Sequence, residues 1–270
     1  MYSKKILDRA NITSYWSDRD SLENYKSTTS KGLNLYSESD IVYKYNNYGF
    51  RCDNFEEESE LPILFIGCSF TEGIGVPVEQ IWSNILLEKI KTKKQKKIPY
   101  WAVAISAAGV DTMATNLYWF YKTFNKKVKY IVALFPGTTR REFKYNTNNY
   151  RLWMNPLEHY NSDCSAIVDP VFSDEEFALH QSERSTMLID SLVENLDAKL
   201  IYSNWKIFEN ICADDHFFKA HLKKHKYIDY PDPTIYQLDY ARDGAHPGPT
   251  MHNKIAEYFW DQYFKKELEK

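Results

Sequence analysis

Four short apolar runs recur along the chain, and a stretch with helical character follows each of them. A run that is apolar at every position is typical of a parallel strand buried on both faces, because such a strand has no side turned to solvent. Strands that alternate with helices favour an α/β fold in which helices cover both faces of a parallel sheet. We therefore predict strands over residues 61–67, 100–106, 128–135 and 198–203, with helices beginning near 78, 110, 173, 214 and 250.

The chain divides into an arm and one larger unit. Residues 1–45 are polar and tyrosine-rich with weak periodicity, which suggests an arm packed over a core. Residues 46–270 carry all the predicted strands, so we expect them to form one domain, with an insertion at about 141–172 that has no clear period. A total of 270 residues, 43% of them hydrophobic and 26% charged, is ordinary for a globular protein with a sizeable core.

The charge and hydropathy of the chain argue against two classes of partner. A formal net charge of -3 gives no electrostatic basis for nucleic acid as the main partner, since such binding normally requires a strongly basic domain. The start of the chain lacks the apolar centre of a signal peptide, and no segment approaches 18 uninterrupted apolar residues. We therefore expect a cytoplasmic protein without a membrane segment.

Neither the cysteines nor the histidines form a recognised metal pattern. The four cysteines lack any CxxC spacing, so free thiols are expected at Cys52, Cys68, Cys164 and Cys212. His221 and His225, with His216 nearby, are spaced to share one helical face and could bind zinc. Because no third ligand follows in a recognised pattern, a lysine-rich surface helix is the favoured interpretation, and no metal is predicted. The lysine-rich run at 89–97 is likewise interpreted as a solvated helix end, with polyanion contact as the alternative.

A serine stands where the first predicted strand ends. Ser69 lies in GCSFTEG between Gly67 and Gly73, at the strand end where open α/β sheets bind ligands. A lone serine could simply cap the next helix. However, the stretch DGAHPG near the end of the chain supplies Asp243 and His246, and a serine hydroxyl becomes a useful nucleophile when a histidine oriented by a carboxylate accepts its proton. The neighbouring Cys68 is the alternative nucleophile, but a buried packing thiol is the favoured interpretation.

These stretches resemble sequence blocks of the SGNH (GDSL-type) hydrolase family. GCSFTEG is similar to the first block, Gly-Asp-Ser-x-Thr-x-Gly, with Cys68 in place of the aspartate, and DGAHPG is similar to the last block, Asp-x-x-His. Between them, SAAGVDT resembles the second block at Gly109. PGTTRRE resembles the third block, Gly-x-Asn-Asp, at Gly137, but Thr139 occupies the asparagine position.

The resemblance implies a flavodoxin-like three-layer α/β/α sandwich with a mainly parallel central sheet, and an acyl-ester hydrolase. Ser69 would attack the carbonyl, His246 would transfer its proton, and Asp243 would hold the imidazole. The oxyanion would be bound by the backbone N–H groups of Ser69 and Gly109, with Thr139 as a third donor. No metal or organic cofactor is implied.

The substrate is predicted from weaker signals. The stretch NNYGFR, residues 46–51, resembles a segment that precedes the first block in relatives thought to act on acylated sugars, and tyrosines are abundant over 145–160. Both favour an O-acylated carbohydrate, preferably acetylated, over a lipid. Arg140 and Arg141 follow the third strand at the substrate edge, so they are candidate substrate contacts, with structural ion pairing as the alternative.

Two other functions stay open at the level of sequence. An acyltransferase would use the same serine and the same acyl-enzyme, and would differ only in the acceptor. A non-catalytic carbohydrate-binding or structural module with a decayed site would account for the missing asparagine of the third block. The sequence makes no prediction about oligomeric state.

Overall fold

A parallel sheet forms the centre of the molecule. The computed structural model describes residues 4–30, 35–138, 140–145, 148–152, 175–205, 214–232, 234–235 and 238–270. Within them the largest sheet has five parallel strands in the order β4-β3-β5-β8-β9. The strands are β3 (Ile63–Gly67), β4 (Trp101–Ala104), β5 (Tyr130–Phe135), β8 (Lys199–Asn204) and β9 (Lys226–Tyr227).

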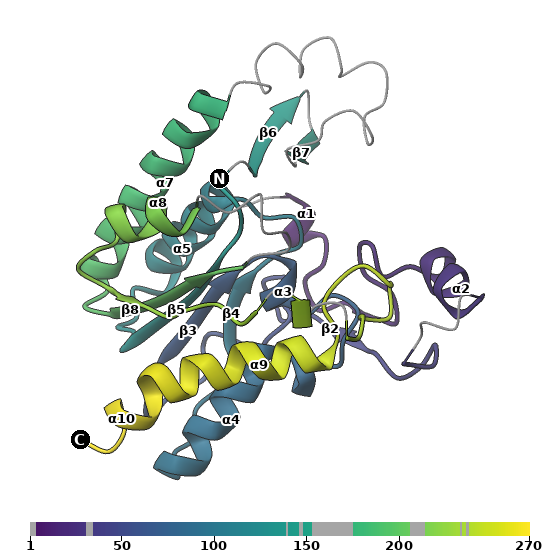
Figure 1. The fold of residues 1–270 in the computed structure, drawn as a ribbon, viewed down its shortest axis with the longest axis horizontal. Coiled ribbons are helices and arrows are strands. Elements are labelled where there is room, and N and C mark those ends of the chain that lie inside the picture. Colours follow the sequence, from purple (N-terminus) through teal and green to yellow (C-terminus); the bar gives the residue numbers. More distant parts are fainter. Residues whose placement is uncertain are drawn as a thin grey trace.

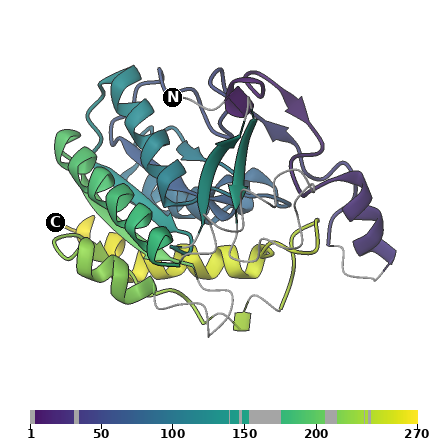
Figure 2. The ribbon, with the colours of Figure 1, turned by 90° about the horizontal axis from the view of Figure 1, so that it is seen from above.

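Helices cover both faces of this sheet (Figures 1 and 2). One layer contains α4 (Trp82–Lys94) and α9 (Pro249–Phe259). The other layer contains α5 (Val110–Phe124) and α7 (Glu175–Asn195), with α8 (Asp214–His221) beside α7. After α9 the chain continues through a π-helical turn, Trp260–Phe264, into α10 (Lys265–Glu267). The predicted three-layer α/β/α fold with a parallel sheet is therefore confirmed.

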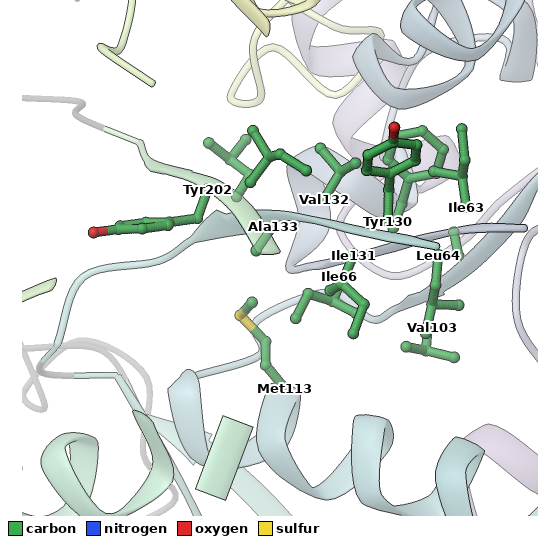
Figure 3. Packing of buried hydrophobic residues seen from close by; sticks show 14 of the residues in the cluster. Ile63, Leu64, Ile66, Val103, Met113, Tyr130, Ile131, Val132, Ala133 and Tyr202 are labelled. Atoms are coloured by element: carbon green, nitrogen blue, oxygen red, sulfur yellow. The ribbon is translucent and has the colours of Figure 1, made fainter. Parts of the chain in front are cut away.

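The core lies on both sides of the central strands, because successive residues of a strand point to opposite faces. On β5, Tyr130 and Val132 lie on one face of the sheet (Figure 3). Ile131 and Ala133 lie on the other face, towards which Met113 of α5 points (Figure 3). All five side chains are buried. This double burial explains why the strands read as unbroken apolar runs.

The predicted boundaries need three corrections. A four-residue helix, α3 (Ser69–Glu72), begins at the serine where only a turn was expected. The helix predicted from residue 78 starts with a 3-10 turn, Val78–Gln80, and becomes α-helical only at Trp82. Helix α8 ends at His221, so His225 lies beyond it and the two histidines do not share a helical face. In addition, β9 was missed because its two residues form no apolar run.

The arm consists of short elements that pack on the core. They are α1 (Lys4–Leu7), β1 (Thr13–Ser14), α2 (Leu22–Ser30) and β2 (Tyr43–Lys44), with β1 antiparallel to β2. Ile41, Tyr43 and Tyr45 of the arm form a small buried cluster with Ile74, which follows α3. The arm therefore contributes buried apolar surface next to the serine.

The segment expected as an insertion begins with an antiparallel hairpin. Strand β6 (Arg141–Tyr145) pairs with β7 (Asn148–Leu152), which the sequence did not predict. The rest of the expected insertion, from residue 153 to 172, lies outside the described residues, as do Cys164 and Cys212.

A buried histidine joins the two helices of one layer. His252 of α9 is 1% exposed, and its Nδ1 accepts the N–H of Trp82 at 3.1 Å, where α4 begins. Burial, with smaller contributions from the charges of His246 and Arg51, lowers the pKa of His252 to about 3. The folded protein therefore keeps this imidazole neutral in the range where an unfolded chain protonates it.

This burial predicts a specific loss of stability in mild acid. Because the unfolded histidine has a pKa near 6.5, the contribution of His252 is fully present above that pH and decreases as the pH falls towards 3. Between pH 6.5 and 5 the parent should lose roughly 2 kcal/mol more free energy of unfolding than His252→Asn, whose amide oxygen can still accept the Trp82 N–H. Urea unfolding at the two pH values measures this, and equal losses in both proteins would contradict it.

Candidate active site

The strand register brings three loops to one edge of the sheet. Gly67, at the end of β3, is aligned with Ala104 of β4 and Leu134 of β5. The segments that follow these strands therefore leave the sheet side by side at its carboxyl edge. They carry Ser69, Gly109 and Arg140, respectively.

Ser69 is held in place by a tight turn at the end of β3. It is the first residue of α3, and a Cβ on Gly67 would overlap the side chain of Thr71 one helical turn later. A glycine is therefore required for α3 to fold back over the strand end. Ser69 is 1% exposed, and its Oγ has no hydrogen-bond partner in the described part of the chain. Cys68 is fully buried within the hydrophobic core, as a packing role requires.

Asp243 and His246 form a hydrogen-bonded pair in the loop before α9. His246 Nδ1 lies 2.6 Å from Asp243 Oδ2, while Asp243 Oδ1 accepts the backbone N–H groups of Ala245, at 3.0 Å, and His246, at 2.9 Å. Gly244 has a φ of 67°, a left-handed conformation that lets the chain turn back between the two side chains. One short turn thus fixes both the position of the carboxylate and the direction of the imidazole.

The carboxylate of this pair is ionised despite its burial. Desolvation opposes the ionisation of Asp243, but the charge of His246 and the hydrogen bonds from His246 and Ala245 outweigh it and lower the pKa of the Asp243 carboxyl. An ionised acceptor at Nδ1 leaves Nε2 of a neutral imidazole free to accept a proton.

Two contacts connect the serine segment with the histidine loop. The ring of Phe70, next to Ser69, lies edge-on to the His246 ring with centroids 6.1 Å apart. The Arg242 N–H donates to the Gly75 carbonyl oxygen at 2.8 Å. Residues more than 160 positions apart in the sequence are therefore neighbours at the edge of the sheet.

Two backbone N–H groups at this edge are available as donors. Those of Ser69 and Gly109 have no acceptor among the residues that the structure describes. A Cβ on Gly109 would overlap the carbonyl oxygen of Arg140, so the segments after β4 and β5 are in close contact here. Thr139, expected as a third donor, lies outside the described residues.

Arg140 and the rings of Trp205 and Phe70 form a stack next to the serine. Arg140 is 4% exposed, and its guanidinium carbon lies 4.6 Å from the centroid of the Trp205 ring. Trp205 follows β8 and stacks on Phe70 with centroids 5.1 Å apart. Of the two arginines predicted as substrate contacts, Arg140 is therefore near the serine. Arg141 is the first residue of β6, and its side chain lies outside the described part of the structure.

The two histidines considered as zinc ligands contact carboxylates of α7 instead. His221 Nε2 lies 3.2 Å from Glu183, and His225 Nε2 lies 2.6 Å from Asp190, both carboxylates belonging to α7. No group of three or more His, Cys, Asp and Glu side chains is placed to hold a metal ion in the described ranges. Nor does any helix there have the length and apolar character to cross a membrane.

The NNYGFR stretch supports the loop that follows the serine. The Arg51 guanidinium donates to the carbonyl oxygens of Gly73 and Val76, the latter at 3.0 Å. Asn46 Oδ1 accepts the N–H groups of Tyr48 and Phe50, which closes a turn. Asn46 and Arg51 also line a cavity of about 290 Å³ next to the arm. None of the predicted catalytic residues lines this cavity.

Sequence reasoning missed Glu72, a buried carboxylate at the end of α3. It accepts the backbone N–H of Ser106 after β4 and pairs with Arg9 of the arm. The only signal was its position three residues after the serine. That spacing becomes informative once α3 is known to be a helix, since the helix then directs Glu72 towards the β4 loop.

No protein-family model matches the chain, and no curated protein matches its sequence. Among solved structures the chain is similar to TesA, at 15% identity and a TM-score of 0.50, over 77% of this chain and 99% of that one. The chain has the SGNH hydrolase fold. The same fold accounts for its likeness to a two-domain esterase, CEX, at 13% identity and a TM-score of 0.50, over 77% of this chain and 50% of that one. At these identities the likeness describes the fold alone.

In this SGNH hydrolase fold, the turn that holds Ser69 depends on the close approach of Gly67 and Thr71. Gly67→Ala should lower the free energy of unfolding by about 1–3 kcal/mol, because the new Cβ overlaps the Thr71 side chain in a packed site. Chemical denaturation measures the cost. In a Thr71→Gly background the same change should cost clearly less, since the overlapping atoms are gone. An equal cost in both backgrounds would show that the overlap does not constrain the turn.

Proposed function

We propose that this protein is a serine esterase that hydrolyses an acyl ester through Ser69, His246 and Asp243. The observation that carries the proposal is the Asp243–His246 pair, whose 2.6 Å hydrogen bond lies in a loop packed against the serine segment. An intact acid–base pair beside a buried serine hydroxyl is the arrangement that nucleophilic acyl transfer requires. It also argues against a binding module with a decayed site.

The proposed reaction proceeds in two steps. Ser69 Oγ attacks the ester carbonyl while His246 Nε2 takes its proton, and the resulting imidazolium, stabilised by Asp243, then protonates the departing alcohol. Water then attacks the acyl carbon while His246 accepts its proton. The bond from the acyl carbon to Ser69 Oγ breaks as His246 returns this proton to Oγ, and the acyl group leaves as a carboxylic acid. This sequence needs no metal or organic cofactor.

The developing oxyanion is assigned to the backbone N–H groups of Ser69 and Gly109. Both lack an acceptor among the described residues, and both are at the edge where the carbonyl would lie. Thr139, outside the described residues, is proposed as the third donor in place of the family's asparagine. Donors that are already oriented stabilise the charge without reorganising during the reaction.

The proposed substrate is a small acyl ester, preferably an acetyl ester, on a carbohydrate. The residues Ser69 and His246 are only 1% and 9% exposed, which favours a short acyl group over a long chain. Arg140 and Arg141, which follow β5 at the edge where the ester would lie, are proposed to contact polar groups of the sugar. CEX, which has the same fold, is active on acetylated mannans.

Hydrolysis and transfer to another hydroxyl share the acyl-enzyme, so the acceptor decides between them. Turnover of 4-nitrophenyl acetate with and without a glycan acceptor separates the two. Release of acetate in proportion to nitrophenol, unaffected by the acceptor, supports hydrolysis. Acetylated acceptor as the main product would show an acyltransferase.

Loss of Ser69 or His246 should abolish turnover without disturbing the fold. Ser69→Ala and His246→Ala are each expected to lower kcat for 4-nitrophenyl acetate by at least ~10³-fold, and the double variant should be little worse, because the two groups act as one unit. His180→Ala, which removes an exposed histidine of α7, serves as the control and should keep parental kcat. Retained activity in Ser69→Ala would contradict the proposal and direct attention to Cys68.

Replacing the carboxylate should be less damaging than removing the nucleophile. Asp243→Asn is expected to lower kcat by about 10²- to 10⁴-fold, because an amide can donate to Nδ1 and stabilise the wrong imidazole tautomer. Steady-state kinetics of this variant, beside the exposed Asp261→Asn as a control, measures the effect. An unchanged rate would mean that another acceptor orients His246.

A further inference from the structure

A fully buried ion pair connects the arm with the residue that precedes Asp243. Arg242 Nε donates to Asp20 Oδ1 at 3.0 Å and its Nη2 donates to Oδ2 at 2.8 Å, and both side chains are 0% exposed. Nη1 of the same guanidinium donates to the Glu38 carbonyl oxygen at 2.7 Å, and Nη2 also donates to that of Tyr15. The guanidinium carbon lies 4.2 Å from the centroid of the Trp16 ring. Asp20 and the three other contacts all belong to the arm.

This pair is part of a closed ring of hydrogen bonds. Arg242 N–H donates to the Gly75 carbonyl oxygen, and Gly75 N–H donates to the Tyr43 hydroxyl at 2.7 Å. The Tyr43 hydroxyl then donates to Asp20 Oδ2 at 2.6 Å, and Asp20 accepts from Arg242. The ring therefore joins the serine segment, the arm and the histidine loop, three parts of the chain that are distant in sequence.

The arm also touches the turn between the catalytic side chains. Thr28 Oγ1 of α2 lies 3.2 Å from the Arg242 carbonyl oxygen. Gly244 leaves no room for a Cβ, which would overlap the methyl carbon of the same threonine. In Figure 1 the loop before α9 lies between the core and α2. The backbone on both sides of Asp243 is thus held by arm residues.

A buried ion pair contributes little net stability, since desolvation of the two charges offsets their attraction. A bidentate guanidinium–carboxylate contact does, however, fix distance and direction together, because its two hydrogen bonds are parallel. Catalytic groups need that kind of restraint, as a displacement of about 1 Å can cost about 10² in rate.

We propose that Asp20 and Arg242 are positioning residues, through which the arm holds the Asp243–His246 loop in register with Ser69. The proposal rests on the proposed function of Ser69, His246 and Asp243. Neither residue touches the substrate. Their effect is expected on the rate of the chemical step and not on substrate binding.

The decisive variant removes both charges at once. Asp20→Asn alone leaves a buried cation and lowers stability, so it is compared with Asp20→Asn/Arg242→Met, in which no charge is left unpaired. The double variant should regain most of the lost thermal stability, yet kcat for 4-nitrophenyl acetate should stay about 10- to 100-fold below the parent, with KM within about twofold. Recovery of parental kcat together with stability would overturn the proposal.

Three companions complete the test. Phe264 packs on Tyr130 in the core, at the edge of the sheet opposite the site. Phe264→Leu should therefore lower stability and leave kcat unchanged. Tyr43→Phe breaks the ring of hydrogen bonds without removing a charge. It should lower kcat several-fold at constant KM, and a parental kcat there would count against the proposal.

Proton NMR gives a readout that does not depend on activity. The downfield His246 Nδ1–H signal of the parent should be lost from the folded double variant, and its persistence would also overturn the proposal. Activity in Ser69→Ala would refute the proposed function itself, whereas an inactive Ser69→Ala beside fully active Asp20 and Arg242 variants would refute the positioning role alone.

Discussion

The parallel pairing of β3 with β4 on one side and β5 on the other is the constraint on which the site depends. Parallel strands end at a common edge, so the aligned positions of Gly67, Ala104 and Leu134 bring the following segments together. These segments carry Ser69, Gly109 and Arg140. Ser69 and Gly109, proposed to act on the acyl group, take their positions from this register. A slip of one residue in any of the three strands would turn its buried side chains to the other face and misplace the loop.

The acid–base pair is positioned by a different means. Asp243 and His246 do not directly follow a strand of the sheet, and their loop is held by the contact of Arg242 with Gly75 and by the arm. A Cβ on Gly75 would lie 2.7 Å from that of Ala241, so glycine is what lets the loop approach so closely. The left-handed φ of 76° at Gly75 adds a second reason for glycine there.

Two ion pairs connect the arm with segments that carry the site. One is Asp20 with Arg242 beside the acid–base loop, and the other is Arg9 with Glu72 at the end of α3. Glu72 also binds the backbone after β4, so this second pair connects the arm with the segment that carries Gly109. Both pairs connect parts of the chain that are distant in sequence, and their charges are compensated only when the arm is in place. The arm is therefore an integral part of the site's geometry.

Much of this was predictable from sequence, for identifiable reasons. Unbroken apolar runs revealed the buried strands, and the order of GCSFTEG and DGAHPG pointed to the Asp243–His246 pair, which the structure shows hydrogen-bonded beside the serine segment. Helix α3 was missed because four residues are too few to show a period, and β9 because two residues form no run. The pairing of Asp20 with Arg242 spans 222 positions, and no local pattern encodes a partner so distant.

Burial links the electrostatics of the site to the substrate it can accept. Asp243 is shielded from water, so its interaction with His246 is screened less than it would be at the surface. In the proposed mechanism, the imidazolium formed when Ser69 reacts would be stabilised by a fixed charge that needs no reorientation. The same shielding leaves little space at Ser69, whose hydroxyl is nearly enclosed by the protein. A site that strengthens its acid–base pair by excluding water also excludes bulky acyl groups, and this shared physical cause connects the proposed mechanism with the proposed preference for acetyl esters.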